Sequence, residues 1–344
     1  MSPDSSLSTL AAEAPRARAF NATDPEDAHR WQAAFRPQLR VMLGLDTMER
    51  RGTPPMIAER LSTQRLADHM REEWTLETEI GYYVSFFLLL PLNTTDRLPL
   101  VLTPHGHGGQ ARREYSGLYA SEEDRERIEA EELDVALQAV REGYAVIAPD
   151  MRGFADLRLR EDIEAGEDNS CWPLSMRALL VGRTLLGERI WDVQRLLDWA
   201  LQREDIDARR VVLTGNSGGG TITLFAAAVD ERVRVCVPAC YFCSFEHSIG
   251  SIKHCACNYI PGMLQAAEMA DVAALIAPRP FLAVNGAHDP IFPIAATRAS
   301  YARLQEAYTL FGAEDTCRLS VGDDGHRYYQ ALVWPVVREF LARS

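Results

Sequence analysis

Short apolar runs, each closed by turn residues, recur along most of this chain and constrain its fold more than any other feature. They are rich in Val, Ile, Leu and Phe and alternate little with polar residues, which is typical of strands buried on both faces. The runs are GYYVSFFLLLPL (81–92), LPLVLTPHG (98–106), YAVIAPD (144–150), RRVVLTGNS (209–217), VRVCVPAC (233–240), RPFLAVNGAHD (279–289) and CRLSVGDDGH (317–326). We expect a strand at each of these places.

Helical patterns lie between most of the runs. Residues 121–143 have an acidic first turn and end at Gly143, as a helix should, and residues 187–204 carry one apolar stripe. Residues 221–233 and the last residues of the chain also have a helical pattern, the latter with a kink expected at Pro335. Strands that alternate with helices predict an α/β fold with a mostly parallel central sheet and helices on both faces.

The first 74 residues of the chain lack the pattern of alternating strands and helices. Residues 1–22 are rich in Ser, Ala and Pro and are expected to lack fixed structure, and residues 23–74 are interpreted as an N-terminal helical extension. Residues 75–344 form one catalytic domain in this interpretation. No secretory signal is expected at the N-terminus, and the longest apolar run, Phe86 to Leu90, is far shorter than the roughly 20 residues of a membrane span.

Net charge and cysteine content limit the classes of binding partner and the redox environment that we expect. The net charge of -13, from 36 basic and 49 acidic residues, argues against nucleic acid or an anionic membrane as a main partner. Seven cysteines, an odd number in a long chain, fit reduced thiols better than a disulfide framework. We therefore expect a cytoplasmic protein that acts on a small molecule, and the sequence is compatible with a homo-oligomer.

The glycine-rich stretch after the fourth run raises a chemical question. Gly215-Asn216-Ser217-Gly218-Gly219 fits the pattern G-x-S-x-G between a strand and a helix, which holds a serine on a tight turn for nucleophilic attack. A phosphate-binding P-loop is the alternative, but Thr221 stands where its lysine should be. The placement favours Ser217 as a nucleophile.

A serine nucleophile needs a base that takes its proton and an acid that orients the base. In folds of this type the order along the chain is Ser, then Asp or Glu, then His. Asp289 closes the next-to-last run and His326 closes the last one, so both follow Ser217 in that order. Rival groups in less suitable positions are Asp323, Asp324 and His288.

The reaction also needs backbone N–H groups that stabilise the oxyanion. One should come from Gly218, the residue after the nucleophile, and another from the loop TPHGHGGQ (103–110). Two other interpretations of this loop are weaker. Its glycines mimic a dinucleotide fingerprint where no helix clearly opens, and His105-x-His107 lacks further ligands at suitable spacing for a metal.

A cysteine-rich segment, residues 240–262, follows the strand after the glycine turn. Cys240, Cys243, Cys255 and Cys257, with His254, allow three interpretations: a structural metal site, a redox pair, or small buried residues that pack a loop near the active site. The spacing of the second pair, C-x-C, matches no common zinc pattern, so packing is favoured. We expect neither a metal nor a cofactor.

Several segments together resemble a known group of proteins. PHGHGG, APDMRGFAD, GRTLLGERIWDVQRLLDWA, TGNSGGGT, NGAHDPIFP and GDDGHRYY are similar to motifs of the α/β-hydrolase superfamily. More narrowly, the chain over 75–344 resembles bacterial acetyl xylan esterase-like and cephalosporin-deacetylase-like esterases, near dienelactone hydrolases and prolyl-oligopeptidase-type enzymes. The resemblance implies an α/β-hydrolase fold with Ser217 as nucleophile, His326 as base and Asp289 as acid. It also implies the backbone amides of Gly218 and His107 as oxyanion donors.

These inferences predict a serine hydrolase that cleaves carboxylic esters through an acyl-enzyme, without a cofactor. The expected substrate carries a small acyl group such as acetyl on a sugar or another polar alcohol. Candidates for substrate contact are His105, Tyr241, His247 and Tyr259. Two alternatives remain: a peptidase or amidase of prolyl-oligopeptidase type, for whose propeller the chain has no room, and a non-catalytic binding protein, which would normally have lost a triad member.

Overall fold

One nine-stranded sheet organises the computed structural model, which describes residues 9–92, 94, 96–108 and 110–343. Its spatial order is β1-β2-β3-β5-β4-β6-β7-β8-β9. The strands are β1 (Ala58–Arg65), β2 (His69–Glu79), β3 (Tyr82–Pro91), β4 (Leu98–Leu102), β5 (Ala145–Pro149), β6 (Ile206–Asn216), β7 (Val235–Ala239), β8 (Phe281–Gly286) and β9 (Cys317–Gly322). A strand is present at each of the seven predicted places, which confirms that part of the sequence analysis.

The sheet is mixed, with its antiparallel part at one side. β1, β2, β3 and β5 pair antiparallel in succession, whereas all pairs from β5 through β4 to β9 are parallel. β4 lies between β5 and β6, so the chain winds in one direction from β4 to β5 and in the other from β6 onward. Ligands of open α/β sheets bind where the winding reverses, outside the carboxyl ends of the strands.

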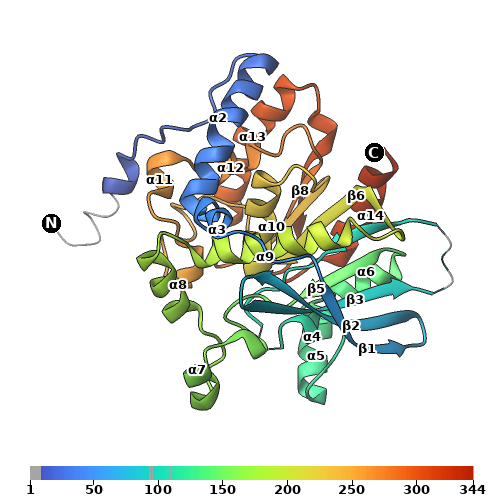
Figure 1. Cartoon of the computed structure of the whole chain (residues 1–344). Coiled ribbons are helices and arrows are strands. Elements are labelled where there is room, and N and C mark those ends of the chain that lie inside the picture. Colours follow the sequence, from blue (N-terminus) through green and yellow to red (C-terminus); the bar gives the residue numbers. More distant parts are fainter. Residues whose placement is uncertain (1–8, 93, 95, 109, 344) are drawn as a thin grey trace.

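Helices cover both faces of this sheet (Figure 1). The main ones are α2 (Pro25–Leu43), α3 (Leu45–Arg50), α5 (Glu122–Ala130), α6 (Val135–Arg141), α8 (Cys171–Leu180), α9 (Leu185–Ala200), α10 (Gly218–Val229), α13 (Ile294–Leu310) and α14 (Gln330–Ala342). Shorter helices are α4 (Arg112–Tyr115), α7 (Arg160–Ala165), α11 (Met263–Ala266), α12 (Met269–Ala274), and the 3-10 turns η1 (Ala155–Leu157), η2 (Ala256–Asn258) and η3 (Glu314–Thr316). Among the described residues no helix is both long enough and apolar enough to span a bilayer.

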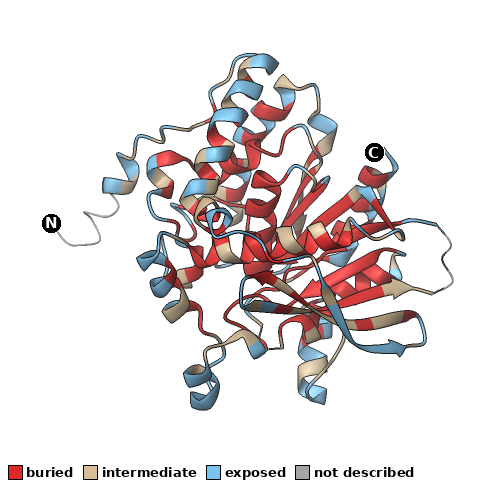
Figure 2. Cartoon of the chain, viewed as in Figure 1, coloured by how far each residue is buried: buried red, intermediate tan, exposed pale blue. Residues whose placement is uncertain are grey.

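The apolar core has two layers, one on each face of the sheet. α2, α9, α10 and α13 contribute to the larger layer, and α6 and α14 contribute to the smaller one. The parallel strands β4, β5, β7 and β8 between these layers are buried throughout, whereas β9 at the edge of the sheet is buried only at its two ends (Figure 2). This two-sided burial explains why their sequences read as continuous apolar runs rather than as alternating ones.

One predicted helix is wrong in its extent. Residues 121–143 form two helices, α5 and α6, and the chain turns between them with Glu132 at a φ of 54°. α5 buries only Ile128, whereas six of the seven residues of α6 are buried. Because one helix lies in solvent and the other under the sheet, a single straight helix cannot serve both positions.

The helical interpretation of residues 23–74 is right for α2 and α3 and wrong beyond them. Residues 58–79 form the β1–β2 hairpin, whose second strand pairs with the apolar strand β3, Trp74 opposite Phe86 and Leu76 opposite Val84. β1 is the outermost strand, exposed from residue 59 to 65, and its register shifts between Arg60 and Ser62. Charged residues at the exposed positions mask the alternation of apolar and polar residues that would indicate a strand. Pairing with β3 then overrides the local secondary-structure preference of this segment.

The N-terminal segment is bound to the domain in its described part. Residues 1–8 lie outside the described residues, but Phe20 is buried and its N–H donates to the Asp271 carboxylate over 2.8 Å. Gln32 of α2 donates from Nε2 to the carbonyl oxygens of Ala274 and Ala277, at 2.9 and 2.7 Å. The expectation that residues 1–22 lack fixed structure is therefore wrong for the residues around Phe20, because hydrogen bonds and apolar burial hold them.

A substitution at Gln32 tests how much α2 stabilises the domain. Gln32→Leu should lower the free energy of unfolding by about 2 kcal/mol or more, because it leaves two buried carbonyl groups without donors. Urea denaturation measures the change. The control, Arg30→Ala, removes exposed ion pairs of the same helix and should change stability by less than about 0.5 kcal/mol. Equal stabilities of the two variants would contradict the bracing role of Gln32.

Candidate active site

Ser217 occupies a strained turn between β6 and α10. Its backbone has φ 55° and ψ -116°, a conformation that residues other than glycine rarely adopt and that costs on the order of 1–3 kcal/mol. α10 begins at the next residue, Gly218, so the first N–H groups of the helix lack intrahelical partners. This is the local geometry that the pattern at 215–219 predicts, with the serine raised at the carboxyl end of the sheet.

The turn is possible because two glycines allow the chain segments to touch. A Cβ atom on Gly215 would lie 2.2 Å from the carbonyl oxygen of Pro104, and one on Gly219 would lie 2.1 Å from the same oxygen. Both distances are far inside van der Waals contact, so no side chain fits at either position. The loop after β4 therefore lies directly against the serine turn.

His326 is held in place by a carboxylate on the neighbouring strand end. Nδ1 of His326 and Oδ2 of Asp289 are 2.7 Å apart, and the Asp289 side chain is fully buried. The other oxygen of Asp289 accepts N–H groups of Ile291 and Phe292, at 2.8 and 3.1 Å. The Phe292 ring stacks on the imidazole of His326, with centroids 5.8 Å apart. Asp289 thus fixes the orientation of the His326 ring through Nδ1, so that Nε2 remains available to accept a proton.

The rival acids and base lie elsewhere. Asp323 and Asp324 are exposed, and Asp324 accepts the N–H of the following Gly325 within its own turn. His288 is exposed beside the buried Asp289. The structure therefore pairs His326 with Asp289 alone among these carboxylates at hydrogen-bond distance.

Ser217 and His326 line one cavity of about 290 Å³ at the carboxyl ends of β4 and β6. Among the described residues there is no hydrogen bond between the Ser217 hydroxyl and His326. Catalytic hydrogen bonds are often long in the free enzyme and shorten when substrate binds. Other residues that line the cavity are His105, Gly106, His107, Gly108, Ala111, Glu114, Tyr115, Arg127, Glu131, Leu133, Asn216 and Ile291.

The charged part of this lining was not found from the sequence. Glu114 is almost fully buried, and burial raises the pKa of its carboxyl, while its ion pair with Arg127 at 2.9 Å opposes the rise. Arg127 and Glu131 are four positions apart within the helix predicted over residues 121–143, where charges normally indicate a solvated face. Only the fold brings these charges to the cavity wall.

The two segments predicted to carry the oxyanion donors lie on either side of Ser217. Gly218 is the first residue of α10, where the helix dipole also favours negative charge. Gly106, next to His107, packs on the serine turn: a Cβ there would lie 2.8 Å from the carbonyl oxygen of Asn216. Gly218 and the loop that carries His107 therefore both adjoin Ser217, as expected for an oxyanion hole.

His105 has a structural position in this loop. Its ring is buried, with Nδ1 2.7 Å from the carbonyl oxygen of Gly106 and Nε2 accepting the N–H of Met151 over 3.0 Å. Burial lowers the pKa of His105 to about 3, which keeps the ring neutral. Both ring nitrogens are engaged, so His105 lines the cavity while it ties the loop after β4 to the loop after β5.

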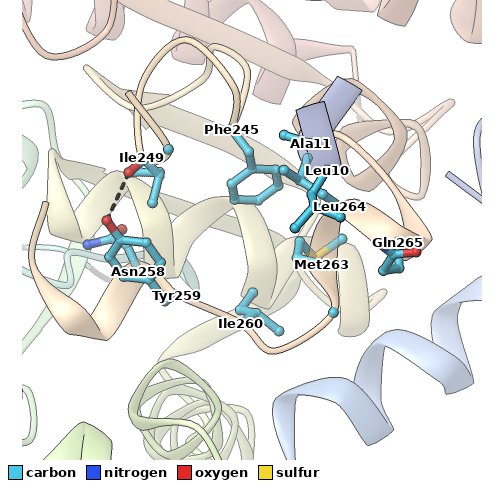
Figure 3. Close-up of a pocket in the computed structure, with 12 residues that line it drawn as sticks. Leu10, Ala11, Phe245, Ile249, Asn258, Tyr259, Ile260, Met263, Leu264 and Gln265 are labelled. Carbon is cyan, nitrogen blue, oxygen red and sulfur yellow. Dashed lines mark hydrogen bonds between the residues drawn. The ribbon is translucent and has the colours of Figure 1, made fainter. Parts of the chain in front are cut away.

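The other three candidates for substrate contact do not line this cavity. Tyr241 is fully buried and packs against Phe292, and the exposed His247 has its Nδ1 3.0 Å from the hydroxyl of Ser244. Tyr259 donates to the carbonyl oxygen of Ile249 beside a separate, apolar cavity of about 400 Å³ (Figure 3). That cavity lies between residues 10–11 and the segment of residues 245–265, which includes η2 and α11.

The four cysteines of the cysteine-rich segment separate into two places. Cys240 and Cys243 are buried directly after β7, where their thiols contact the carbonyl oxygens of Arg327 and Pro293, and burial raises the pKa of both. Cys255 and Cys257 lie instead near His107, together with a cysteine that the sequence analysis did not connect to them, Cys171. The two pairs of cysteines therefore lie in the same segment of the sequence but at different places in the structure.

The sequence pattern of the acetyl xylan esterase (AXE1) family matches residues 81–259. This range contains the loop after β4, the loop after β5 and the serine turn. A relative in Bacillus subtilis (strain 168), YtaP, whose name places it among the hydrolases, is 28% identical over 300 residues, which cover 86% of this chain and 94% of the relative.

Three solved structures show a similar fold. A Bacteroides fragilis protein whose name places it with the acetyl xylan esterases has a TM-score of 0.78 at 18% identity and covers 98% of this chain and 84% of its own. A glucuronoyl esterase from Solibacter usitatus has a TM-score of 0.67 at 16% identity, with 96% and 98% covered. The acetyl xylan esterase from Paenibacillus sp. R4 has a TM-score of 0.59 at 18% identity, with 99% of both chains covered.

At these identities the structural likeness establishes the fold, which is that of the α/β-hydrolases. The family match establishes more, because it spans over half of the 344 residues. The chain belongs to the acetyl xylan esterase family and is a carboxylic ester hydrolase.

Proposed function

We propose that this chain cleaves its ester through an acyl-enzyme on Ser217, with His326 as the base and Asp289 as the acid that orients it. One observation carries the proposal: Ser217, on its strained turn, and His326, held at 2.7 Å by a buried Asp289, line the same cavity. Residues with these roles at these positions constitute a nucleophile, a base and an orienting group.

The proposed reaction has two halves. His326 takes the proton of the Ser217 hydroxyl as its oxygen attacks the ester carbonyl, and the resulting imidazolium is stabilised by the Asp289 carboxylate. The amides of Gly218 and His107 stabilise the oxyanion, and His326 returns the proton to the departing alcohol. Water, deprotonated by the same histidine, then attacks the acyl group and releases the acid and the free serine.

The cavity also favours a class of substrate. Its volume of about 290 Å³ suits a small acyl group, and Glu114, Arg127 and Glu131 make one wall polar and charged. Apolar chains gain nothing from such a wall, whereas hydroxyl groups find acceptors and donors there. We therefore propose an acetyl ester of a sugar or another polar alcohol as the substrate.

A side-by-side assay tests the substrate class. The panel comprises aryl acetate, aryl octanoate, acetylated xylo-oligosaccharides, a glucuronoyl methyl ester and aminoacyl-arylamides. The expected order of kcat/KM places the acetyl esters first and the arylamides last. A preference for octanoate or for an arylamide would contradict the proposed substrate without affecting the triad.

Replacement of the nucleophile should abolish turnover while the fold remains. Ser217→Ala is expected to lower kcat on aryl acetate by about 10³-fold or more, because only binding and the oxyanion hole remain. A serine-directed phosphonate should label the wild type at Ser217 and leave the variant unlabelled. Ser251→Ala, at an exposed serine, is the control and should keep full activity. Labelling of the Ser217→Ala variant would place the nucleophile elsewhere.

A second prediction separates Asp289 from its rivals. Asp289→Asn should lower kcat by about 10³- to 10⁴-fold, because an amide cannot stabilise the imidazolium and favours the wrong tautomer of His326. The matched controls are Asp323→Asn and Asp324→Asn, which should stay within about threefold of wild type. Kinetics at saturating substrate, with circular dichroism to check folding, measure these effects. A larger loss in either control than in Asp289→Asn would reassign the acid.

A further inference from the structure

Four potential metal ligands converge beside the proposed active site from three separate segments. His107 lies in the loop after β4, Cys171 is the first residue of α8, and Cys255 and Cys257 flank Ala256 at the start of η2. One ligand atom of each lies within 4.8 Å of every other. The Sγ atom of Cys257 is 3.3 Å from Nε2 of His107 and 3.2 Å from Sγ of Cys255. All three cysteines are free thiols.

This spacing is close to that of a tetrahedral centre. With metal–sulfur bonds of about 2.3 Å, two sulfurs of a tetrahedral zinc site lie about 3.8 Å apart. Four donors that are all mutual neighbours can surround one ion without moving the backbone far. Cys171 and Cys257 are buried, whereas His107 is exposed and Cys255 is partly so, which leaves a path by which an ion enters.

A buried arginine supplies an independent observation. Arg189 of α9 is only 2% exposed and donates from Nη2 to Sγ of Cys171 over 3.2 Å. Within the described part of the chain, no carboxylate oxygen lies within 4.0 Å of its guanidinium, whose other hydrogen bonds go from Nε and Nη2 to the neutral carbonyl oxygen of Arg152, at 3.0 and 2.7 Å. A buried guanidinium needs an opposite charge, because an isolated ion is costly to bury. Metal-bound thiolate sulfur at Cys171, 3.2 Å from Nη2 of Arg189, would supply this charge.

We propose that Nε2 of His107 and the sulfurs of Cys171, Cys255 and Cys257 bind one zinc ion. Thiolate and imidazole ligands in a closed set of four are typical of structural zinc, and soft sulfur donors disfavour magnesium and calcium. Three thiolates, one neutral imidazole and Zn²⁺ carry a net charge of -1, which Arg189 balances. The thiols lose their protons to solvent when the ion binds, and no electron is transferred.

A bound zinc ion would also affect the proposed catalysis. This consequence rests on the proposed function, whereas the metal site itself does not. A Cβ on Gly218 would lie 2.7 Å from Nδ1 of His107, so the imidazole packs on the first residue of α10. Zinc on Nε2 would leave the proton on Nδ1 and fix the ring. The ion would thus hold the loop that carries one proposed oxyanion donor against the residue that carries the other.

Elemental analysis tests the site directly. The full chain, produced in zinc-supplemented medium and purified in reducing buffer without chelators or a metal-affinity tag, should contain about one zinc per chain. Cys257→Ser should contain less than about 0.1, and the control Cys236→Ser, at a buried cysteine outside the site, should keep about one. Zinc-free wild type, or iron or copper in its place, would overturn the proposal.

Cobalt substitution and thiol titration give readouts that depend on neither activity nor the folding of a variant. Wild type loaded with Co²⁺ should show the intense visible bands of a tetrahedral cobalt–thiolate centre, and an organomercurial should release the native zinc into a metallochromic dye. Ser217→Ala should bind zinc as wild type does, so a failed triad and a failed metal site are distinguishable. Absence of the cobalt bands in wild type, or zinc that stays bound after all thiols have reacted, would refute these ligands.

Discussion

The contact between the Pro104 carbonyl oxygen and two glycines is the constraint on which the rest of the site depends. Gly215 and Gly219 leave no room for a Cβ atom, so the end of β4 can lie directly beneath the turn that carries Ser217. This contact joins the two strands at the point where the winding of the sheet reverses. The loop after β4, the first turn of α10 and the cavity between them take their positions from it.

Buried ion pairs then tie the antiparallel side of the sheet to that centre. Arg152, in the loop after β5, donates to both oxygens of Asp192 at 2.7 and 2.8 Å and also pairs with Glu79 of β2 at 3.2 Å. Arg112, after the loop of β4, pairs with Asp150 and with Glu73 of β2. Removing one partner of such a pair leaves an uncompensated buried charge, which costs about 3–5 kcal/mol. The β1–β2 hairpin, with its many acidic residues, is thus held to the rest of the domain by these ion pairs.

The sequence was informative where local chemistry decides the structure. Apolar runs predicted the strands from β3 to β9, and the order of Ser217, Asp289 and His326 placed each at a strand end, where the fold brings Asp289 and His326 into contact. The hairpin of residues 58–79 was missed because its strand conformation depends on pairing with β3 and not on the preferences of its own residues. Cys171 was missed for a related reason: its neighbours Cys255 and Cys257 are 84 and 86 residues away, and no spacing rule describes a cluster that only tertiary packing assembles.

The outermost strand β1 limits how copies of this chain can associate. An edge strand presents a row of free N–H and C=O groups with which another extended chain can pair, and native proteins usually guard such edges. Here Glu59, Arg60 and Arg65 place charge along the free side, and the bulge between Arg60 and Ser62 breaks the regular spacing that a further strand would need. A regular strand addition at this edge is therefore disfavoured, whereas the opposite edge of the sheet is formed by β9.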